Sequence, residues 1–184
     1  DVGEKVSLTG GGTALILGAG GAARAVAYGL LKNGWQVWIA ARRLEQAEQI
    51  VRDLMTLGNS QPENPHRVRA LSLVQDLAFA VEENQSLRLV VNATPVGTSG
   101  IENGSPLPPQ VCFSNETCFY DLVYNPPETT FLRQARERGC KAWNGFGMLI
   151  QQAALAFECW TARQLLVTPE VQAKIFSRIQ KHHD

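Results

Sequence analysis

A glycine-rich segment near the start of the chain has the composition and spacing of a diphosphate-binding turn. Gly18-Ala19-Gly20-Gly21-Ala22-Ala23 fits the pattern G-x-G-x-x-A and lies between a strand-like and a helix-like segment. In this pattern the first glycine permits a tight turn and the second lets the backbone approach a pyrophosphate. N–H groups at the helix start would face the anion, and the helix dipole would favour it. We therefore predict that a dinucleotide binds Gly18, Ala19, Gly20, Gly21 and Ala22, the alternative being a glycine-rich turn without a ligand.

The residues after the second predicted strand bear on which nicotinamide cofactor would fit. An NAD-specific fold carries an acidic residue about 20 positions beyond the glycines, which accepts hydrogen bonds from the ribose. Here Ile39-Ala40-Ala41-Arg42-Arg43 has no carboxylate and two guanidinium groups. Arg42 and Arg43 could pair with a 2′-phosphate and lie against the adenine. They could also be a solvated pair, although a helix start is a poor place for cations. We therefore predict a preference for NADP.

The elements that would position these residues alternate between strand length and helix length. Short apolar runs rich in β-branched residues predict strands, and apolar residues at helical spacing predict helices. The predicted strands are residues 13–17, 36–41, 68–71, 87–92, 118–122 and 140–143. The predicted helices are residues 22–33, 44–57, 74–84, 128–138 and 148–166, with a last helix opening at Thr168-Pro169-Glu170. This rhythm predicts an α/β, Rossmann-like doubly wound fold, with a mostly parallel sheet of about six strands and helices on both faces.

Composition and charge exclude several other classes of function. The chain has 184 residues, 45% of them hydrophobic, and its 17 basic residues balance 17 acidic ones. Such a chain can bury a core as one soluble domain, and it has no net field that would attract nucleic acid or an anionic membrane. Its four cysteines have no zinc-site spacing, and no apolar run approaches the roughly 20 residues that span a bilayer. We expect a cytoplasmic protein with no metal, no nucleic-acid partner and no membrane partner.

Four further segments resemble the shikimate dehydrogenase family, in its order and at its spacing. Asn92-Ala93-Thr94-Pro95-Val96-Gly97 is similar to N-A-T-P-x-G, and Asp121-Leu122-Val123-Tyr124-Asn125-Pro126 is similar to D-x-x-Y-x-P. Residues 145–153 resemble G-x-G-M-L-x-x-Q-A, and residues 156–161 continue the match. The chain departs from the family at residues 41–46, where A-R-R-L-E-Q replaces N-R-T-x-x-R, and at Thr98, where methionine is common. The resemblance implies the NADP-binding domain of such an oxidoreductase.

The resemblance also implies roles for individual residues. The turn that contains Thr94 would border the nicotinamide and its ribose, where the alternative is an ordinary turn. Gly145 would meet the nicotinamide amide through its backbone, and Leu122 and Met148 would line the ring, although apolar residues at such places are often plain core. The implied substrate contacts are Tyr124 and Gln152, whereas Gln151 would face elsewhere on the helix.

The motifs of this chain do not include the catalytic groups of the family. The family places the lysine and aspartate that assist proton transfer in an N-terminal substrate domain, so no residue of this chain is assigned a catalytic role. We expect residues 1–12 to be a linker or the remnant of a preceding domain, residues 13–166 to be the NADP-binding domain, and residues 167–184 to be a helix that packs back toward the missing domain. The implied reaction is the reduction of 3-dehydroshikimate to shikimate with NADPH. A quinate or related dehydrogenase, with NAD as a further option, and a non-catalytic dinucleotide-binding module are the alternatives.

Overall fold

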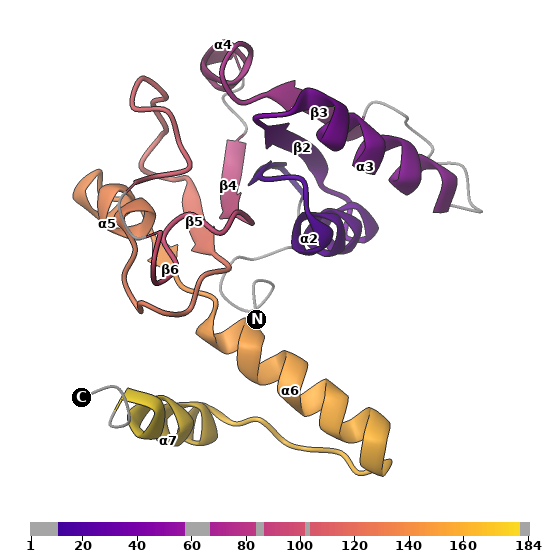
Figure 1. Ribbon diagram of the computed structural model, residues 1–184, viewed down its shortest axis with the longest axis vertical. Helices are drawn as coiled ribbons and strands as arrows, with labels where there is room; N and C mark the ends of the chain where they lie inside the picture. Colours follow the sequence, from indigo (N-terminus) through magenta and orange to yellow (C-terminus); the bar gives the residue numbers. More distant parts are fainter. Residues whose placement is uncertain (1–10, 58–66, 84–86, 102–103, 181–184) are drawn as a thin grey trace.

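Six parallel strands form the centre of the molecule. The computed structural model describes residues 11–57, 67–83, 87–101 and 104–180. The strands are β1 (Thr13–Leu17), β2 (Gln36–Ala41), β3 (Val68–Ser72), β4 (Leu87–Asn92), β5 (Cys118–Asp121) and β6 (Ala142–Trp143), in the order β3-β2-β1-β4-β5-β6 (Figure 1). All five pairings are parallel, so the predicted Rossmann-like sheet is confirmed. In this order the chain returns from one edge to the centre between β3 and β4, which creates a switch point where β1 and β4 lie side by side.

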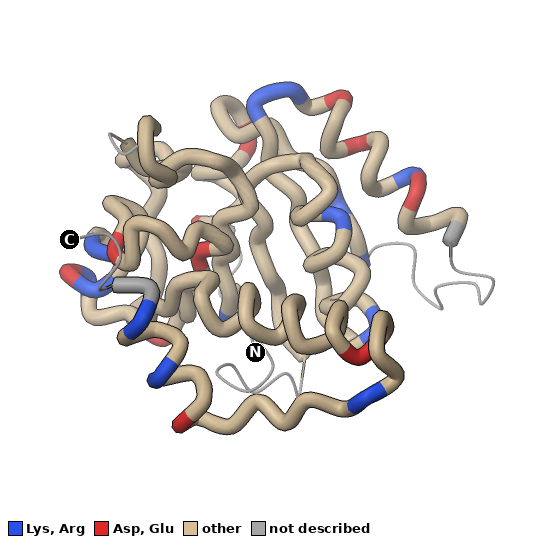
Figure 2. The backbone as a smooth tube through the Cα atoms, turned by 60° about the horizontal axis from the view of Figure 1, so that its bottom comes forward, with Lys and Arg blue, Asp and Glu red and all other residues tan. Residues whose placement is uncertain are grey.

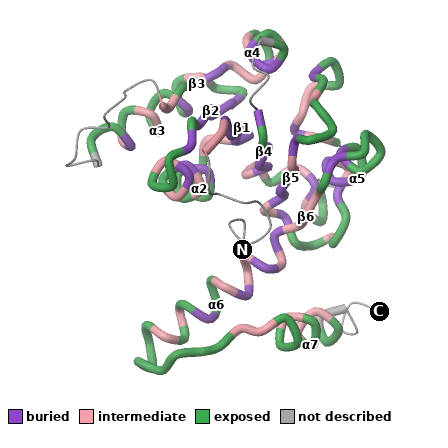
Figure 3. Tube along the Cα trace, turned by 180° about the vertical axis from the view of Figure 1, so that it is seen from behind, coloured by how far each residue is buried: buried purple, intermediate pink, exposed green. Residues whose placement is uncertain are grey.

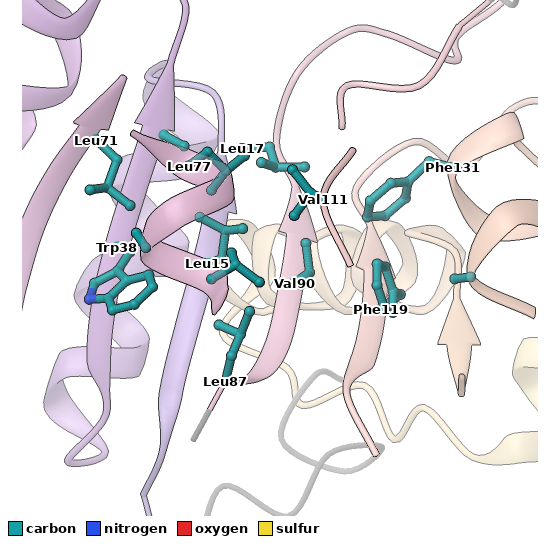
Figure 4. Close-up of a cluster of buried hydrophobic side chains, with 14 of the residues drawn as sticks. Leu15, Leu17, Trp38, Leu71, Leu77, Leu87, Val90, Val111, Phe119 and Phe131 are labelled. Carbon is teal, nitrogen blue, oxygen red and sulfur yellow. The ribbon is translucent and has the colours of Figure 1, made fainter. Parts of the chain in front are cut away.

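Helices cover both faces of the sheet, as predicted. One face packs against α2 (Gly21–Lys32) and α3 (Leu44–Leu57), and the other packs against α4 (Leu77–Glu83) and α5 (Thr130–Glu137). Side chains of a strand alternate between faces, so Ile16 lies in the first core and Leu15 in the second. Figure 4 shows the second core, where leucine and aromatic side chains of the strands meet α4 and α5. All five residues of β1 are buried, as expected for a strand covered on both faces.

The helix predicted at residues 74–84 begins later than expected. It starts at Leu77, because the residues before it form a turn closed by Asp76. The Asp76 carboxylate accepts a hydrogen bond from the Ser72 N–H at 2.9 Å, and the Asp76 N–H donates to the Ser72 carbonyl at 3.2 Å. A local side-chain bond of this kind competes with helix formation. Residue 84 lies outside the described residues.

The helix predicted at residues 148–166 is shorter at its C-terminal end. It is α6 (Phe146–Thr161), and it ends because Ala162 adopts a left-handed conformation with φ 53°. The segment that follows is held instead by Glu158, whose carboxylate accepts a hydrogen bond from the Leu165 N–H at 3.0 Å. The last predicted helix is present as α7 (Pro169–Gln180).

The two C-terminal helices stand beside the sheet domain. α6 leads away from the end of β6, and α7 turns back alongside it (Figure 1). The rings of Phe146 and Phe176 join the two helices at 4.9 Å between centroids. Figure 3 shows α7 and the C-terminal part of α6 largely exposed, and the side chain of Trp160 is 84% exposed. Within the described residues, no helix is both long enough and apolar enough to cross a membrane.

Candidate functional site

The ends of β1 and β4 meet at the switch point of the sheet. The Ala93 N–H donates to the Leu17 carbonyl at 2.9 Å, and the Gly18 N–H donates to the Ala40 carbonyl at 2.8 Å. Gly18 has φ 105°, and a Cβ there would lie 3.0 Å from both the Ala93 oxygen and a Thr94 methyl carbon. Only glycine suits this turn. The structure therefore brings together Gly18 and Thr94, which separate motifs place in the site.

Beyond this turn, the N-terminus of α2 faces open space. Gly20 is the N-cap residue and makes no side-chain cap, and the first turn of the helix has no acidic residue. A Cβ added at Gly20 or at Gly21 would meet nothing within 4 Å. Gly21 and Ala22 are also exposed, whereas Ala23 is buried against the sheet, as the motif predicts. Free N–H groups beside open space form a cradle that fits a diphosphate.

Arg42 and Arg43 lie on the same edge of the sheet, between β2 and α3. Both are exposed, and neither side chain has an ion-pair or hydrogen-bond partner among the residues that the structure describes. Arg24 differs, since its guanidinium pairs with Asp53 of α3 at 2.6 Å. Figure 2 shows basic and acidic segments interleaved over the molecule rather than gathered by sign. The two arginines are therefore a local cationic group that could receive an anion.

A buried polar network lies at the carboxyl ends of β4 and β5 and at the start of α5. The Asp121 carboxylate, at the end of β5, accepts hydrogen bonds from the Asn92 amide at 2.8 Å, the Val123 N–H at 3.0 Å and the Thr129 hydroxyl at 2.6 Å. From the sequence alone these residues have no assigned role. An acidic residue at the end of a buried strand, followed eight positions later by a helix N-cap threonine, is the signal that would have indicated them.

Burial changes the acidity of this carboxyl. Desolvation raises the pKa of Asp121 from 3.8 to about 6, although the hydrogen bonds from Thr129, Val123 and Asn92 lower it. The folded protein therefore binds this proton more tightly than the unfolded chain does. The contribution of Asp121 to the free energy of unfolding is full below about pH 4 and is lost as pH rises through about 6.

This linkage gives a testable result with Asp121→Asn, which does not titrate. The free energy of unfolding of the variant, relative to the wild-type chain, is expected to increase by on the order of 2–3 kcal/mol between about pH 4 and about pH 7. Urea unfolding at several pH values in this range measures the difference. A difference that stays constant would show that the carboxyl titrates at its ordinary value.

Gly145 is held against the backbone that follows β5. Its N–H donates to the Val123 carbonyl at 3.1 Å, and a Cβ there would lie 2.3 Å from the Leu122 oxygen. This contact brings the start of α6 to the end of β5. Leu122 and Met148 are both half-buried, so each presents part of its side chain at the edge of the sheet. The predicted cofactor residues of this half thus come from adjoining elements.

The two residues with an implied substrate contact lie on the outside of the described structure. Tyr124 follows β5 and is 46% exposed, and Gln152 lies on an exposed part of α6. Neither side chain hydrogen-bonds to another residue in the described part of the chain. Their exposure leaves both available for a ligand, and their roles stay predictions.

A cavity of about 500 Å³ lies elsewhere in the molecule. Its lining includes Leu87, the first residue of β4, and Thr117, which precedes β5, so it opens at the amino ends of these strands. Open parallel sheets bind ligands outside the carboxyl ends of their strands. We therefore place the candidate site at the opposite edge, over the Gly18 turn, Arg42 and the Asp121 network.

Comparison with known proteins shows what the chain is similar to. A scan against protein-family models found no match. The NADP-dependent shikimate dehydrogenase of Salinibacter ruber is 41% identical over 156 residues, which are 83% of this chain and 52% of the relative. The enzyme of the same name from Carboxydothermus hydrogenoformans is 36% identical over 158 residues, which are 86% of this chain and 51% of the relative. The chain is a homologue of shikimate dehydrogenases. It spans about half the length of these curated relatives.

Solved structures agree with the shikimate dehydrogenase homology. The shikimate 5-dehydrogenase of Thermus thermophilus, in complex with NADP(H) and shikimate, is 36% identical with a TM-score of 0.73, covering 95% of this chain and 57% of that one. A quinate dehydrogenase from Corynebacterium glutamicum, in complex with NAD, is 26% identical with a TM-score of 0.78, covering 96% of this chain and 58% of that one. The predicted family resemblance is thus confirmed, and both cofactors occur among similar structures.

Proposed function

We propose that this chain binds NADP(H) and forms the cofactor half of a shikimate dehydrogenase. The observation that carries the proposal is the open cradle at Gly20 and Gly21, which lies on the same sheet edge as Arg42 and Arg43, two side chains without a partner among the described residues. Amides at the helix start suit the diphosphate, and guanidinium groups suit a 2′-phosphate. The absence of a carboxylate after β2 removes the partner that an NAD ribose would use.

The remaining residues would orient the reacting end of the cofactor. When bound, NADPH would supply a hydride to the carbonyl carbon of 3-dehydroshikimate, which with a proton would give shikimate and NADP⁺. The turn at Thr94 and the backbone at Gly145 would fix the nicotinamide side, with Leu122 and Met148 against the ring. Tyr124 and Gln152 would hydrogen-bond to the substrate. The proton would come from a lysine and an aspartate of a substrate domain, and closure of the two domains would exclude water.

The C-terminal helices offer a surface for that substrate domain. Large apolar side chains are exposed along α6 and the segment after it, and the most exposed are Trp160 at 84% and Leu166 at 81%. Exposed apolar side chains close together mark an interaction site. These side chains precede residue 167, so they support contact of α6 and of the segment after it with a substrate domain. The packing of residues 167–184 toward that domain stays a prediction. Most of the proposed linker, residues 1–10, lies outside the described residues.

Titration of the chain with NADPH and with NADH tests the proposed cofactor. Calorimetry is expected to show binding of NADPH and weaker binding of NADH. Binding of neither coenzyme would contradict the proposed function, and equal binding of both would remove the NADP preference.

Arg42→Ala tests the proposed contact with the 2′-phosphate. Hydrogen bonds between charged groups are worth about 1.5–3 kcal/mol, so NADPH affinity is expected to fall by about one to two decades while NADH affinity is unchanged. Arg133→Ala is the matched control, because Arg133 is an exposed arginine on α5, at the opposite face of the sheet. Equal losses for NADPH and NADH would mean that Arg42 does not recognise the phosphate.

A quinate dehydrogenase is the second candidate, supported by the similar structure that holds NAD. A panel of shikimate and quinate with both coenzymes, using protein that includes the substrate domain, separates the two activities.

A non-catalytic dinucleotide-binding module is the third candidate function. The gene's full reading frame tests it, because a domain of roughly 100 residues with the expected lysine and aspartate would support an enzyme.

A further inference from the structure

We propose that Asp121 is a positioning residue that holds the nicotinamide side of the site in shape. It fastens three segments that end at the same edge of the sheet: the turn after β4, the loop after β5 and the start of α5. This inference rests on the proposed function, because it assigns the nicotinamide to this half of the edge.

The carboxylate is the common acceptor of the three segments. Its Oδ1 accepts from the Asn92 amide at 2.8 Å and from the Val123 N–H at 3.0 Å, and its Oδ2 accepts from the Thr129 hydroxyl at 2.6 Å. Asp121, Asn92 and Thr129 are all buried. The backbones of β4 and β5 are already paired, and the Leu122 N–H donates to the Asn92 carbonyl at 2.9 Å. In the described structure, Asp121 is the one residue whose side-chain oxygens join all three segments.

From Asp121 the network continues into the turn that borders the proposed nicotinamide site. The Asn92 amide nitrogen also donates to the Val96 carbonyl at 3.1 Å. The Asn92 side-chain oxygen accepts from the Thr94 N–H at 2.9 Å and from the Thr94 hydroxyl at 2.6 Å. Both hydrogens of the amide are therefore used, and the orientation of Asn92 is fixed by Asp121 on one side and by the turn on the other.

On its other side the network reaches the start of α6. Val123, whose N–H donates to Asp121, accepts the Gly145 N–H on its carbonyl at 3.1 Å. Asn92 therefore links the turn at Thr94 to the Asp121 carboxylate, and Val123 links Gly145 to it. The two backbone segments proposed to hold the nicotinamide are each connected to the same carboxylate through one residue. In the part of the chain that the structure describes, the glycine cradle and Arg42, which would hold the adenosine side, make no hydrogen bond to Asp121.

A buried carboxylate is a costly way to stabilise a fold. Asp121 has no cation partner among the described residues, and desolvation disfavours its charged form. Three donors aimed at one anion nevertheless fix their own geometry more strongly than a neutral acceptor would. The arrangement therefore favours rigidity of the edge over stability of the whole molecule, which is what a site that orients a ring requires.

The experiment compares two ligands of the chain. NADPH carries both halves of the cofactor, whereas adenosine 2′,5′-bisphosphate lacks the nicotinamide. Asp121→Asn keeps the shape but loses the acceptor for the Thr129 hydroxyl, and Thr129→Val loses that donor. Each variant is expected to weaken NADPH binding by about tenfold and to change the affinity for the bisphosphate by less than about twofold, as measured by calorimetry. The increase in nicotinamide fluorescence on binding should fall in parallel.

Thr117→Val separates positioning from a merely structural effect. Thr117 is also buried, and its hydroxyl donates to the Leu87 carbonyl at 3.1 Å, but it lies at the opposite edge of the sheet. This variant is expected to lose stability while keeping the wild-type ratio of the two affinities.

The outcomes separate this inference from the proposed function. If the wild-type chain binds neither ligand, the proposed function and this inference both fail. If it binds both, and the Asp121 and Thr129 variants lose affinity for both equally or for neither, only the positioning role of Asp121 is overturned. If Asp121→Asn does not fold, Thr129→Val gives the same comparison with the carboxylate in place.

Discussion

Gly20→Val is expected to lower the affinity for NADPH by at least about a hundredfold while leaving the fold intact. Gly20 has φ −100° and ψ −172°, an extended conformation that valine adopts readily, and an added Cβ meets nothing within 4 Å. The new side chain would occupy the space that a diphosphate needs to come within about 3 Å of the α2 amides. Loss of two charged hydrogen bonds, each worth about 1.5–3 kcal/mol, exceeds two decades in affinity.

The control for this substitution lies in the same helix. Gly29 is also a glycine of α2 whose added Cβ would meet nothing within 4 Å, but it lies away from the N-terminus. Gly29→Ala is expected to raise the free energy of unfolding by about 0.5–1 kcal/mol and to leave NADPH affinity unchanged. Calorimetry and thermal unfolding by circular dichroism measure both effects. Full NADPH affinity in folded Gly20→Val would rule out a diphosphate at this cradle.

Sequence periodicity is sufficient for most of the sheet. The strands at residues 13–17, 36–41 and 87–92 are predicted with the bounds that the structure has. The first two are apolar runs that end at a glycine or an arginine, where burial on both faces stops. Local composition decides such segments, because each one is covered on both sides whatever the neighbouring strands are. The glycine cradle is also predictable from local sequence, because all its residues belong to one contiguous motif.

Contacts between distant residues explain what the sequence does not predict. The Asp121 network joins positions 92, 121 and 129, and its members meet only because β4 and β5 are paired in the sheet. The end of α6 depends on Ala162 leaving the helix and on the bond from Leu165 to Glu158. Both features depend on interactions that hydrophobic spacing does not record. The roles of Tyr124 and Gln152 depend on a ligand, so they remain predictions in the structure as well.

Gly145→Ala is expected to lower the free energy of unfolding by about 3 kcal/mol or more. Overpacking costs typically about 1–3 kcal/mol, and here the obstacle is rigid. The added methyl would lie 2.3 Å from the Leu122 oxygen and 2.7 Å from its carbonyl carbon, which are backbone atoms. Relief requires α6 to move away from the end of β5, which would break the bond from the Gly145 N–H to Val123. Urea unfolding measures the loss, and the melting temperature should fall by roughly 6–12 °C.

Gly29→Ala makes the same chemical change at an open position, so the difference between the two variants isolates the contact with Leu122. The displacement of α6 should also weaken NADPH binding and spare adenosine 2′,5′-bisphosphate, because only the nicotinamide half depends on Gly145. A loss of stability below about 1 kcal/mol would mean that the backbone after β5 yields easily. In that case the close approach of Leu122 would not explain why residue 145 is glycine. The inference that the Asp121 network keeps this edge of the sheet rigid would then lack support at the start of α6.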